Sequence, residues 1–125
     1  MIYLKNIRLI LGSLALITTT LLTSCYREKD SIARITVIDN SSGPVDNAMV
    51  RLYPTPVSGG AIVVDDTLYT DASGEALFNY SEIFKPGQTG LLVLDIEVRG
   101  PNGEYGEGII KVREEETNEA TVIVN

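Results

Sequence analysis

From residue 32 onward the chain consists of short runs rich in Val, Ile and Tyr, separated by clusters of Gly, Pro, Asn and Asp. No stretch of this region keeps the period of about 3.6 residues that an amphipathic helix shows. Several runs instead alternate apolar and polar residues, as a strand with one buried face does. Short alternating runs between turn clusters predict an all-β domain, either a sandwich or a barrel.

The runs predict seven strands, and their alternation predicts which residues face the core. The strands are expected at residues 33–39, 47–53, within 62–70, and at 75–80, 91–99, 107–113 and 120–124. Successive side chains of a strand point to opposite faces, so apolar residues two positions apart share one face. The inner faces are expected to carry Ala48, Val50, Leu52, Ala76, Phe78, Ile96, Val98, Ile110, Val112, Val122 and Val124.

Two tight turns are predicted from residue types that favour them. Gly43 is expected to supply a positive φ before Pro44, whose ring restricts its own φ. Asp71 is expected to accept hydrogen bonds from backbone N–H groups, and Gly74 is expected in the left-handed region.

Longer connections are predicted where Pro, Gly or runs of charge interrupt the alternation. They are expected at residues 54–60, 81–90, 100–103 and 114–118. The first should be a loop because its prolines cannot pair in a central strand. The second has room for one helical turn near residues 82–84, and the third reads as a hairpin turn.

The first 22 residues have a different character. Lys5 and Arg8 precede an apolar stretch at residues 9–22, which is 22 − 9 + 1 = 14 residues long. A membrane-spanning helix needs about 20 apolar residues, so this stretch is too short to be a permanent span. A basic start followed by a short apolar segment is typical of a signal peptide.

At the end of this stretch, Leu22, Thr23 and Ser24 precede Cys25, the chain's single cysteine. These four residues resemble, position by position, the lipobox of bacterial lipoprotein precursors. The resemblance implies cleavage before Cys25, a diacylglycerol on its sulfur and further acylation of its amine, which together anchor a protein stably in a lipid bilayer. Residues 1–24 would then be a signal peptide, and residues 25–31 the lipidated cysteine and a short tether. Residues 32–125 would be the exported domain, held at the outer membrane on either its periplasmic or its cell-surface face.

Charge and cysteine content exclude several functions for that mature chain. It would contain 125 − 24 = 101 residues, with 17 acidic and 10 − 2 = 8 basic side chains, a net charge of −9. Nucleic-acid binding is not expected because it requires a basic surface. With Cys25 acylated, no thiol remains for a disulfide or for catalysis.

A second resemblance covers the exported domain. Residues 36–39, 43–53 and 69–78 resemble the carboxypeptidase regulatory-like domain family. The matching positions are Gly43, Pro44, Ala48, Val50, Leu52, Thr70, Asp71, Gly74 and Phe78. The resemblance implies a seven-stranded Greek-key, transthyretin-like β-sandwich that serves as an accessory module.

Catalytic and metal-binding patterns are weak in this sequence. The chain has no histidine, which removes the Ser-His-Asp arrangement and the commonest zinc ligand. Asp71, Ser73 and Glu75 are spaced like half of a calcium loop, but the series ends at Ala76, and an Asx-type turn explains it better. We therefore expect no enzyme activity, no cofactor and no metal site.

The remaining hypothesis concerns binding. Tyr53, Pro54 and Pro56, with Tyr69, are the candidate contact residues, because tyrosine offers rigid contact area and a proline-rich loop loses little entropy on docking. The expected partner is an envelope protein or a surface polymer. The alternative is a carbohydrate-binding module displayed on the cell surface. A structural reading, in which the tyrosines only cover the sandwich edge, also stays open.

Overall fold

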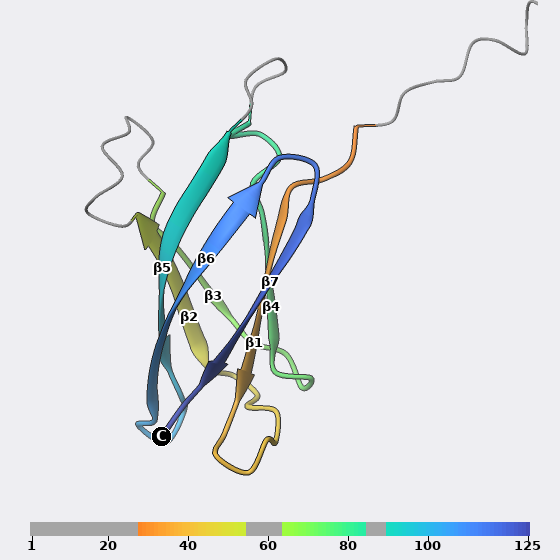
Figure 1. Cartoon of the computed structure of the whole chain (residues 1–125). Helices are drawn as coiled ribbons and strands as arrows, with labels where there is room; N and C mark the ends of the chain where they lie inside the picture. Colours follow the sequence, from red (N-terminus) through yellow and green to blue (C-terminus); the bar gives the residue numbers. More distant parts are fainter. Residues whose placement is uncertain (1–27, 55–63, 85–89) are drawn as a thin grey trace, which may run out of the picture.

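The computed structural model describes residues 28–54, 64–84 and 90–125 as a two-sheet, all-β domain (Figure 1). Its strands are β1 (Ile32–Ile38), β2 (Met49–Pro54), β3 (Asp66–Tyr69), β4 (Glu75–Asn79), β5 (Leu91–Arg99), β6 (Tyr105–Arg113) and β7 (Thr117–Ile123). The predicted signal peptide, the lipobox residues Leu22, Thr23 and Ser24, the anchor Cys25 and the contact residue Pro56 lie outside the described residues. Within the described ranges, no helix is long and apolar enough to cross a membrane.

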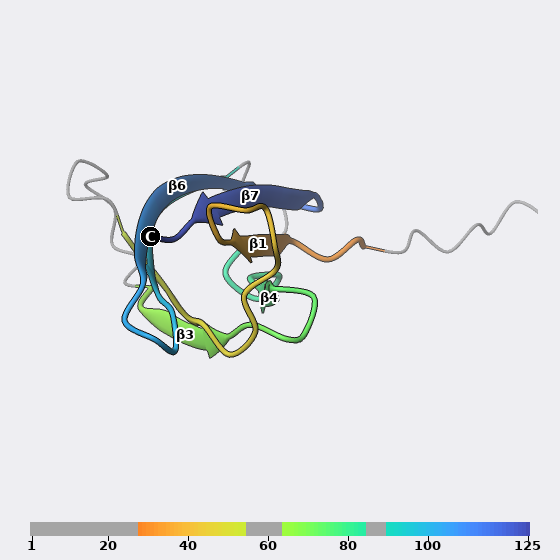
Figure 2. The same ribbon diagram turned by 90° about the horizontal axis from the view of Figure 1, so that it is seen from below.

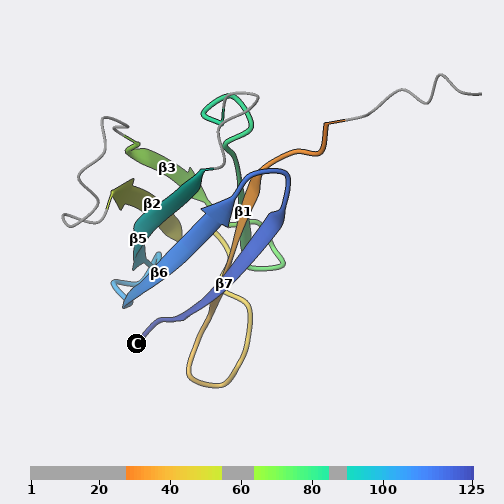
Figure 3. The same cartoon turned by 45° about the horizontal axis from the view of Figure 1, so that its top comes forward.

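The strands form a β-sandwich of two sheets. One sheet has the order β4-β1-β7 and the other the order β3-β2-β5-β6 (Figure 3). All neighbouring pairs are antiparallel except β1 and β7, which run parallel. The predicted all-β sandwich is confirmed at this level.

The core lies between the two sheets, and the alternation in the sequence located it correctly. All eleven residues expected on the inner faces are buried. The core also contains Ala33, Ile35, Val37, Val64, Tyr80, Leu92 and Leu94. Burying each large apolar side chain contributes about 1.5–3 kcal/mol, which offsets the entropy lost when the strands are ordered.

The two sheets meet along β6 and β7 on one side of the sandwich (Figure 2). These strands belong to different sheets, but Tyr105 and Asn125 exchange backbone hydrogen bonds of 3.1 and 3.2 Å at their end. β7 passes very close to β6 at Gly106, where an added Cβ would lie 2.7 Å from the carbonyl oxygen of Ile123. Glycine is therefore required at this crossing for packing, although the sequence pattern does not single it out.

The turn before β4 forms as predicted. The Asp71 carboxylate accepts hydrogen bonds from the N–H groups of Ser73 (2.9 Å) and Glu75 (3.0 Å), and Gly74 has a φ of 74°. Thr70, the residue just before this turn, is itself held in place. Its hydroxyl donates a hydrogen bond to the Val45 carbonyl at 2.6 Å and accepts one from the Ala48 N–H at 2.9 Å. The carboxylate of Asp71 is thus used by the turn itself, as the Asx interpretation requires.

The turn after β1 differs from the prediction. Ser42, with a φ of 65°, occupies the left-handed position that was expected at Gly43. Asp39 explains the difference, since its carboxylate accepts hydrogen bonds from Ser41 and Gly43 and shapes the turn from within. The same hydrogen bonds, with the Ser41 hydroxyl first, hold the pKa of Asp39 below its usual range. An added Cβ at Gly43 would approach Asp39 to 3.1 Å, so glycine serves a close contact here.

Several predicted boundaries were also wrong. Pro54 closes β2 opposite Leu94 instead of beginning a loop. On the other side of β2, β3 pairs only as far as Leu52, so Pro54 has no partner there. β6 and β7 begin earlier than expected, at Tyr105 and Thr117, because backbone pairing continues through polar residues. Residues 81–84 form turns rather than a helical turn.

Candidate interaction surface

The outer face of the β3-β2-β5-β6 sheet carries the most elaborate group of polar and aromatic side chains among the described residues. It is formed by the residues of β2, β5 and β6 that point away from the core. They are Met49, Arg51, Tyr53, Leu91, Val93, Asp95, Glu97, Arg99, Tyr105, Glu107, Ile109, Lys111 and Arg113. We call this surface the outer face.

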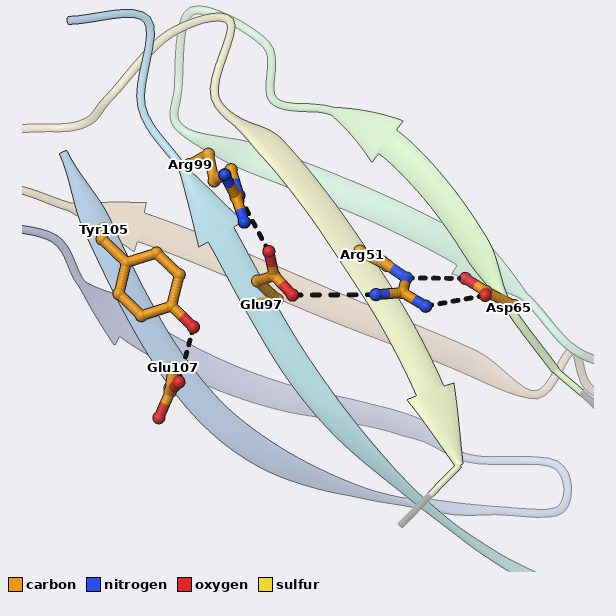
Figure 4. A network of polar contacts seen from close by, with 6 residues as sticks. All are labelled: Arg51, Asp65, Glu97, Arg99, Tyr105 and Glu107. Atoms are coloured by element: carbon orange, nitrogen blue, oxygen red, sulfur yellow. Dashed lines mark hydrogen bonds and ion pairs between the residues drawn. The ribbon is translucent and has the colours of Figure 1, made fainter. Parts of the chain in front are cut away.

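A chain of ion pairs crosses the outer face (Figure 4). Arg51 binds Asp65 with two hydrogen bonds of 2.9 Å, in the bidentate geometry that arginine forms with carboxylates. Its third nitrogen lies 3.7 Å from Glu97, which also accepts a 2.8 Å hydrogen bond from Arg99. Glu97 is the centre of this chain, with only 15% of its side chain exposed. Two arginines therefore compensate the charge of a carboxylate that is largely covered.

These contacts shift the pKa values of the paired groups in the direction that favours their charges. The hydrogen bonds to Asp65 raise the pKa of Arg51, and those from Arg51 lower the pKa of Asp65, with burial acting against each shift. Both side chains therefore stay charged at neutral pH. The Arg51–Asp65 ion pair is accordingly kept at neutral pH.

Tyrosine rings flank this chain. The Arg51 guanidinium lies 4.7 Å from the centroid of the Tyr53 ring, and the Arg99 guanidinium lies 6.0 Å from that of Tyr105. The Tyr105 hydroxyl donates a hydrogen bond to Glu107. That bond is the main cause that raises the pKa of Tyr105 to about 12, so the phenol remains a donor at neutral pH. Rings and guanidinium groups thus hold one another in place by cation–π contacts.

A shallow, open groove lies beside this network. It has a volume of about 400 Å³ and is lined by Tyr53, Asp95, Ile96, Glu107, Gly108 and Ile109. Tyr53, Asp95 and Ile109 stand side by side on three neighbouring strands, since Asp95 pairs with both of the others. The groove thus combines an aromatic ring, two carboxylates and an aliphatic wall.

The structure separates the predicted contact residues. Tyr69 pairs with Met49, four residues along β2 from Tyr53, which at about 3.3 Å per residue is about 13 Å. Tyr69 is 63% exposed on the edge strand β3, whereas Tyr53 is half-buried at the groove. Pro54 lies in β2, next to the residues outside the described ranges. Tyr53 and Tyr69 therefore do not form one contact site, and only Tyr53 belongs to the groove.

Sequence reasoning missed Asp95, Glu107 and Ile109 as site residues. For Asp95 the sequence did contain a signal. Residues 95, 97 and 99 alternate with buried apolar residues, so their side chains must face outward together. The missing information was strand order. Only the pairing of β5 with both β2 and β6 brings Asp95 between Tyr53 and Ile109.

Comparison with known proteins supports the fold but identifies no family. No family model and no curated protein sequence matches the chain. Among solved structures, the chain is similar to the dioxygenase domain of a dioxygenase carbohydrate-binding protein fusion from the cellulolytic bacterium Streptomyces sp. SirexAA-E, with a TM-score of 0.53. The match covers 84% of this chain and 85% of that domain at 11% sequence identity. At that identity it shows a shared all-β, two-sheet fold and nothing about chemistry.

Proposed function

We propose that this chain is a bacterial lipoprotein, anchored through an acylated Cys25, whose sandwich binds a protein partner in the cell envelope without catalysing a reaction. In this proposal the sandwich is the transthyretin-like module that residues 43–53 and 69–78 resemble. The observation that carries the binding role is the outer face, where arginine and tyrosine side chains are already fixed by ion pairs and cation–π contacts. Arginine and tyrosine are enriched at protein interfaces, and side chains that are fixed beforehand lose less entropy on binding.

The path of the chain suits an anchor at Cys25. The described tether, residues 28–31, leaves the sandwich at the end opposite the C-terminus (Figure 1). The strands run between these two ends, so the outer face extends along the side of the sandwich. An anchor at Cys25 would hold one end near the lipid and leave the outer face accessible to a neighbouring protein.

Carbohydrate binding is the second candidate. The groove supports it, because carboxylates such as Asp95 and Glu107 can accept hydrogen bonds from sugar hydroxyls beside the ring of Tyr53. A sugar platform also needs an open ring face, and Arg51 already lies over the ring of Tyr53. We therefore place protein binding first.

The anchor is tested by replacing Cys25 with serine. Serine cannot form the thioether, so we expect Cys25→Ser to remove the acyl mass and to leave an uncleaved or soluble precursor. Intact-mass measurement of the native protein should show a chain that starts at Cys25 and carries acyl groups. A native mature chain that starts elsewhere and carries no lipid would contradict this part of the proposal.

The interaction face is tested by photocrosslinking in cells at two matched positions. Ile109 is 60% exposed on the outer face, and Leu77 is 52% exposed on the opposite sheet, so the two aliphatic positions are similarly available to solvent. We expect a photoreactive residue at position 109 to crosslink a discrete protein and the same residue at position 77 to give none. Equal crosslinking from both positions, or none from 109, would show that the outer face is not the binding surface.

A further inference from the structure

We propose that the groove at Tyr53 and Asp95 receives an arginine or lysine side chain from a basic segment of the partner protein. This inference rests on the proposed function and specifies the chemistry of its partner. The cation would lie against the Asp95 carboxylate, beside the ring of Tyr53, with Glu107 on the far side of the groove.

The first argument is the charge that the fold leaves uncompensated. Among the described residues, the carboxylate of Asp95 has no hydrogen-bond partner and no ion pair, although Asp95 is half-buried. The neighbouring carboxylates are all engaged: Glu97 with Arg51 and Arg99, Asp65 with Arg51, and Glu107 with the hydroxyl of Tyr105. An unpaired carboxylate within an otherwise matched network is the position where an external cation gains most.

The second argument is that the cations on the outer face are not directed at this carboxylate. The cross-strand neighbours of Asp95 are Tyr53 and Ile109, neither of which carries a charge. Arg51, diagonal on β2, is already paired with Asp65 and Glu97, and Lys111, diagonal on β6, forms no ion pair in the described part of the chain. The lining of the groove therefore contains two carboxylates and no cation.

The third argument is the aromatic wall. This face already places a guanidinium against a tyrosine ring twice, Arg51 at Tyr53 and Arg99 at Tyr105. A guanidinium from a partner would find the Asp95 carboxylate in the groove, beside the part of the Tyr53 ring that lines it and that Arg51 leaves uncovered. The groove is open and has a volume of about 400 Å³, which is enough for one long side chain to enter from solvent.

Charge complementarity favours a cationic occupant over a neutral sugar. A sugar hydroxyl can donate to a carboxylate or to an amide oxygen, so it makes little use of the negative charge of Asp95. A guanidinium gains from that charge directly, and the chain as a whole is acidic, with a net charge of −7. Binding of a cation should consequently weaken as salt is added.

The test uses the full chain in detergent micelles and two labelled peptides. One is a short Gly/Ser peptide that carries paired arginines, and the other is identical except that citrulline, which is neutral and of the same shape, replaces each arginine. We expect the arginine peptide to bind at least about tenfold more tightly than the citrulline peptide. That is the ratio of affinities that one charge-assisted hydrogen bond provides. Asp95→Asn should remove most of this difference, whereas Asp46→Asn, at an exposed carboxylate in the loop after β1, should leave it unchanged.

The outcomes separate this inference from the proposed function. Equal affinity for the two peptides, or an unchanged ratio in an Asp95→Asn protein whose thermal melt matches that of the wild type, overturns the inference. Binding of a neutral oligosaccharide that depends on Asp95, without binding of the arginine peptide, also overturns it. If crosslinking from position 109 persists in Asp95→Asn, the proposed function stands and only the cationic chemistry is wrong. If position 109 gives no crosslink, the proposed function itself fails.

Discussion

Gly74→Ala is expected to lower the free energy of unfolding by about 2–4 kcal/mol, because the new Cβ meets two independent penalties. Gly74 has a φ of 74°, a conformation that residues with a side chain adopt only with strain. The Cβ would also lie 2.6 Å from the carbonyl oxygen of Val37 and 3.2 Å from the backbone nitrogen of Val45. These are backbone atoms of β1 and of the chain leading to β2, so they cannot move aside as a flexible side chain would.

Gly103→Ala is the matched control, since it contains one penalty without the other. Gly103 also has a positive φ, 87°, but an added Cβ there would meet no atom within 4 Å. We expect this variant to lower the free energy of unfolding by about 1 kcal/mol, which is the backbone-conformation penalty alone. Denaturant unfolding of both variants measures the difference through the midpoints. If both variants lower the denaturant midpoint equally, the close contact between Gly74 and β1 adds nothing to the loss of stability.

Gly106→Ala is expected to destabilise the domain by about 1–3 kcal/mol for a different reason, overpacking at the crossing of β6 and β7. The φ of Gly106 is not positive, so no conformational strain contributes. Its Cβ would lie 2.7 Å from both the carbonyl oxygen of Ile123 and a methyl group of Val122, with a methyl group of Val124 at 3.0 Å. β7 would have to move away from β6, which would open the side of the sandwich where the two sheets join.

Gly108→Ala, two residues along the same face of β6, provides the comparison. Its nearest contacts would be side-chain methyl groups of Val122 at 3.3 Å and Ile96 at 3.4 Å, which can shift by a few tenths of an ångström. We expect a cost below about 1 kcal/mol in the same denaturant measurement. A Gly108→Ala midpoint as low as that of Gly106→Ala would mean that the close approach of β7 at Ile123 has no special cost.

The two glycines show how far sequence reasoning extends. The positive φ of Gly74 is a local property, because Asp71, Gly74 and Glu75 form a turn from neighbouring residues, and it was predicted correctly. The close approach of Val37 to Gly74 was not predicted, because it depends on β1. The role of Gly106 depends on β7, which lies beside β6 only after the sandwich has assembled. The turn at Asp39 shows the same limit on a smaller scale, because a side-chain carboxylate moved the left-handed position from Gly43 to Ser42.

The candidate site shows a similar division. Tyr53 was recognised from its type and its place before a proline-rich stretch, and it does line the groove. Its predicted partner Tyr69 lies near the other end of β2, because the register of β3 against β2 cannot be obtained from either strand alone. Asp95 was visible only as one of several outward polar residues, and nothing in the sequence distinguishes it from Glu97, which two arginines neutralise.

The sequence by itself determined the class of fold, the approximate positions of the strands, and inner-face residues of β2, β4, β5, β6 and β7. Those properties follow from the two-residue period of a strand and from local turn chemistry, which short stretches of chain contain completely. The tertiary structure alone decided which strands became neighbours and at what register. That decision creates the ion-pair chain through Glu97 and leaves the Asp95 carboxylate unpaired beside Tyr53. Cross-strand neighbours come from segments far apart in the chain, since Tyr53 and Asp95 are 95 − 53 = 42 residues apart.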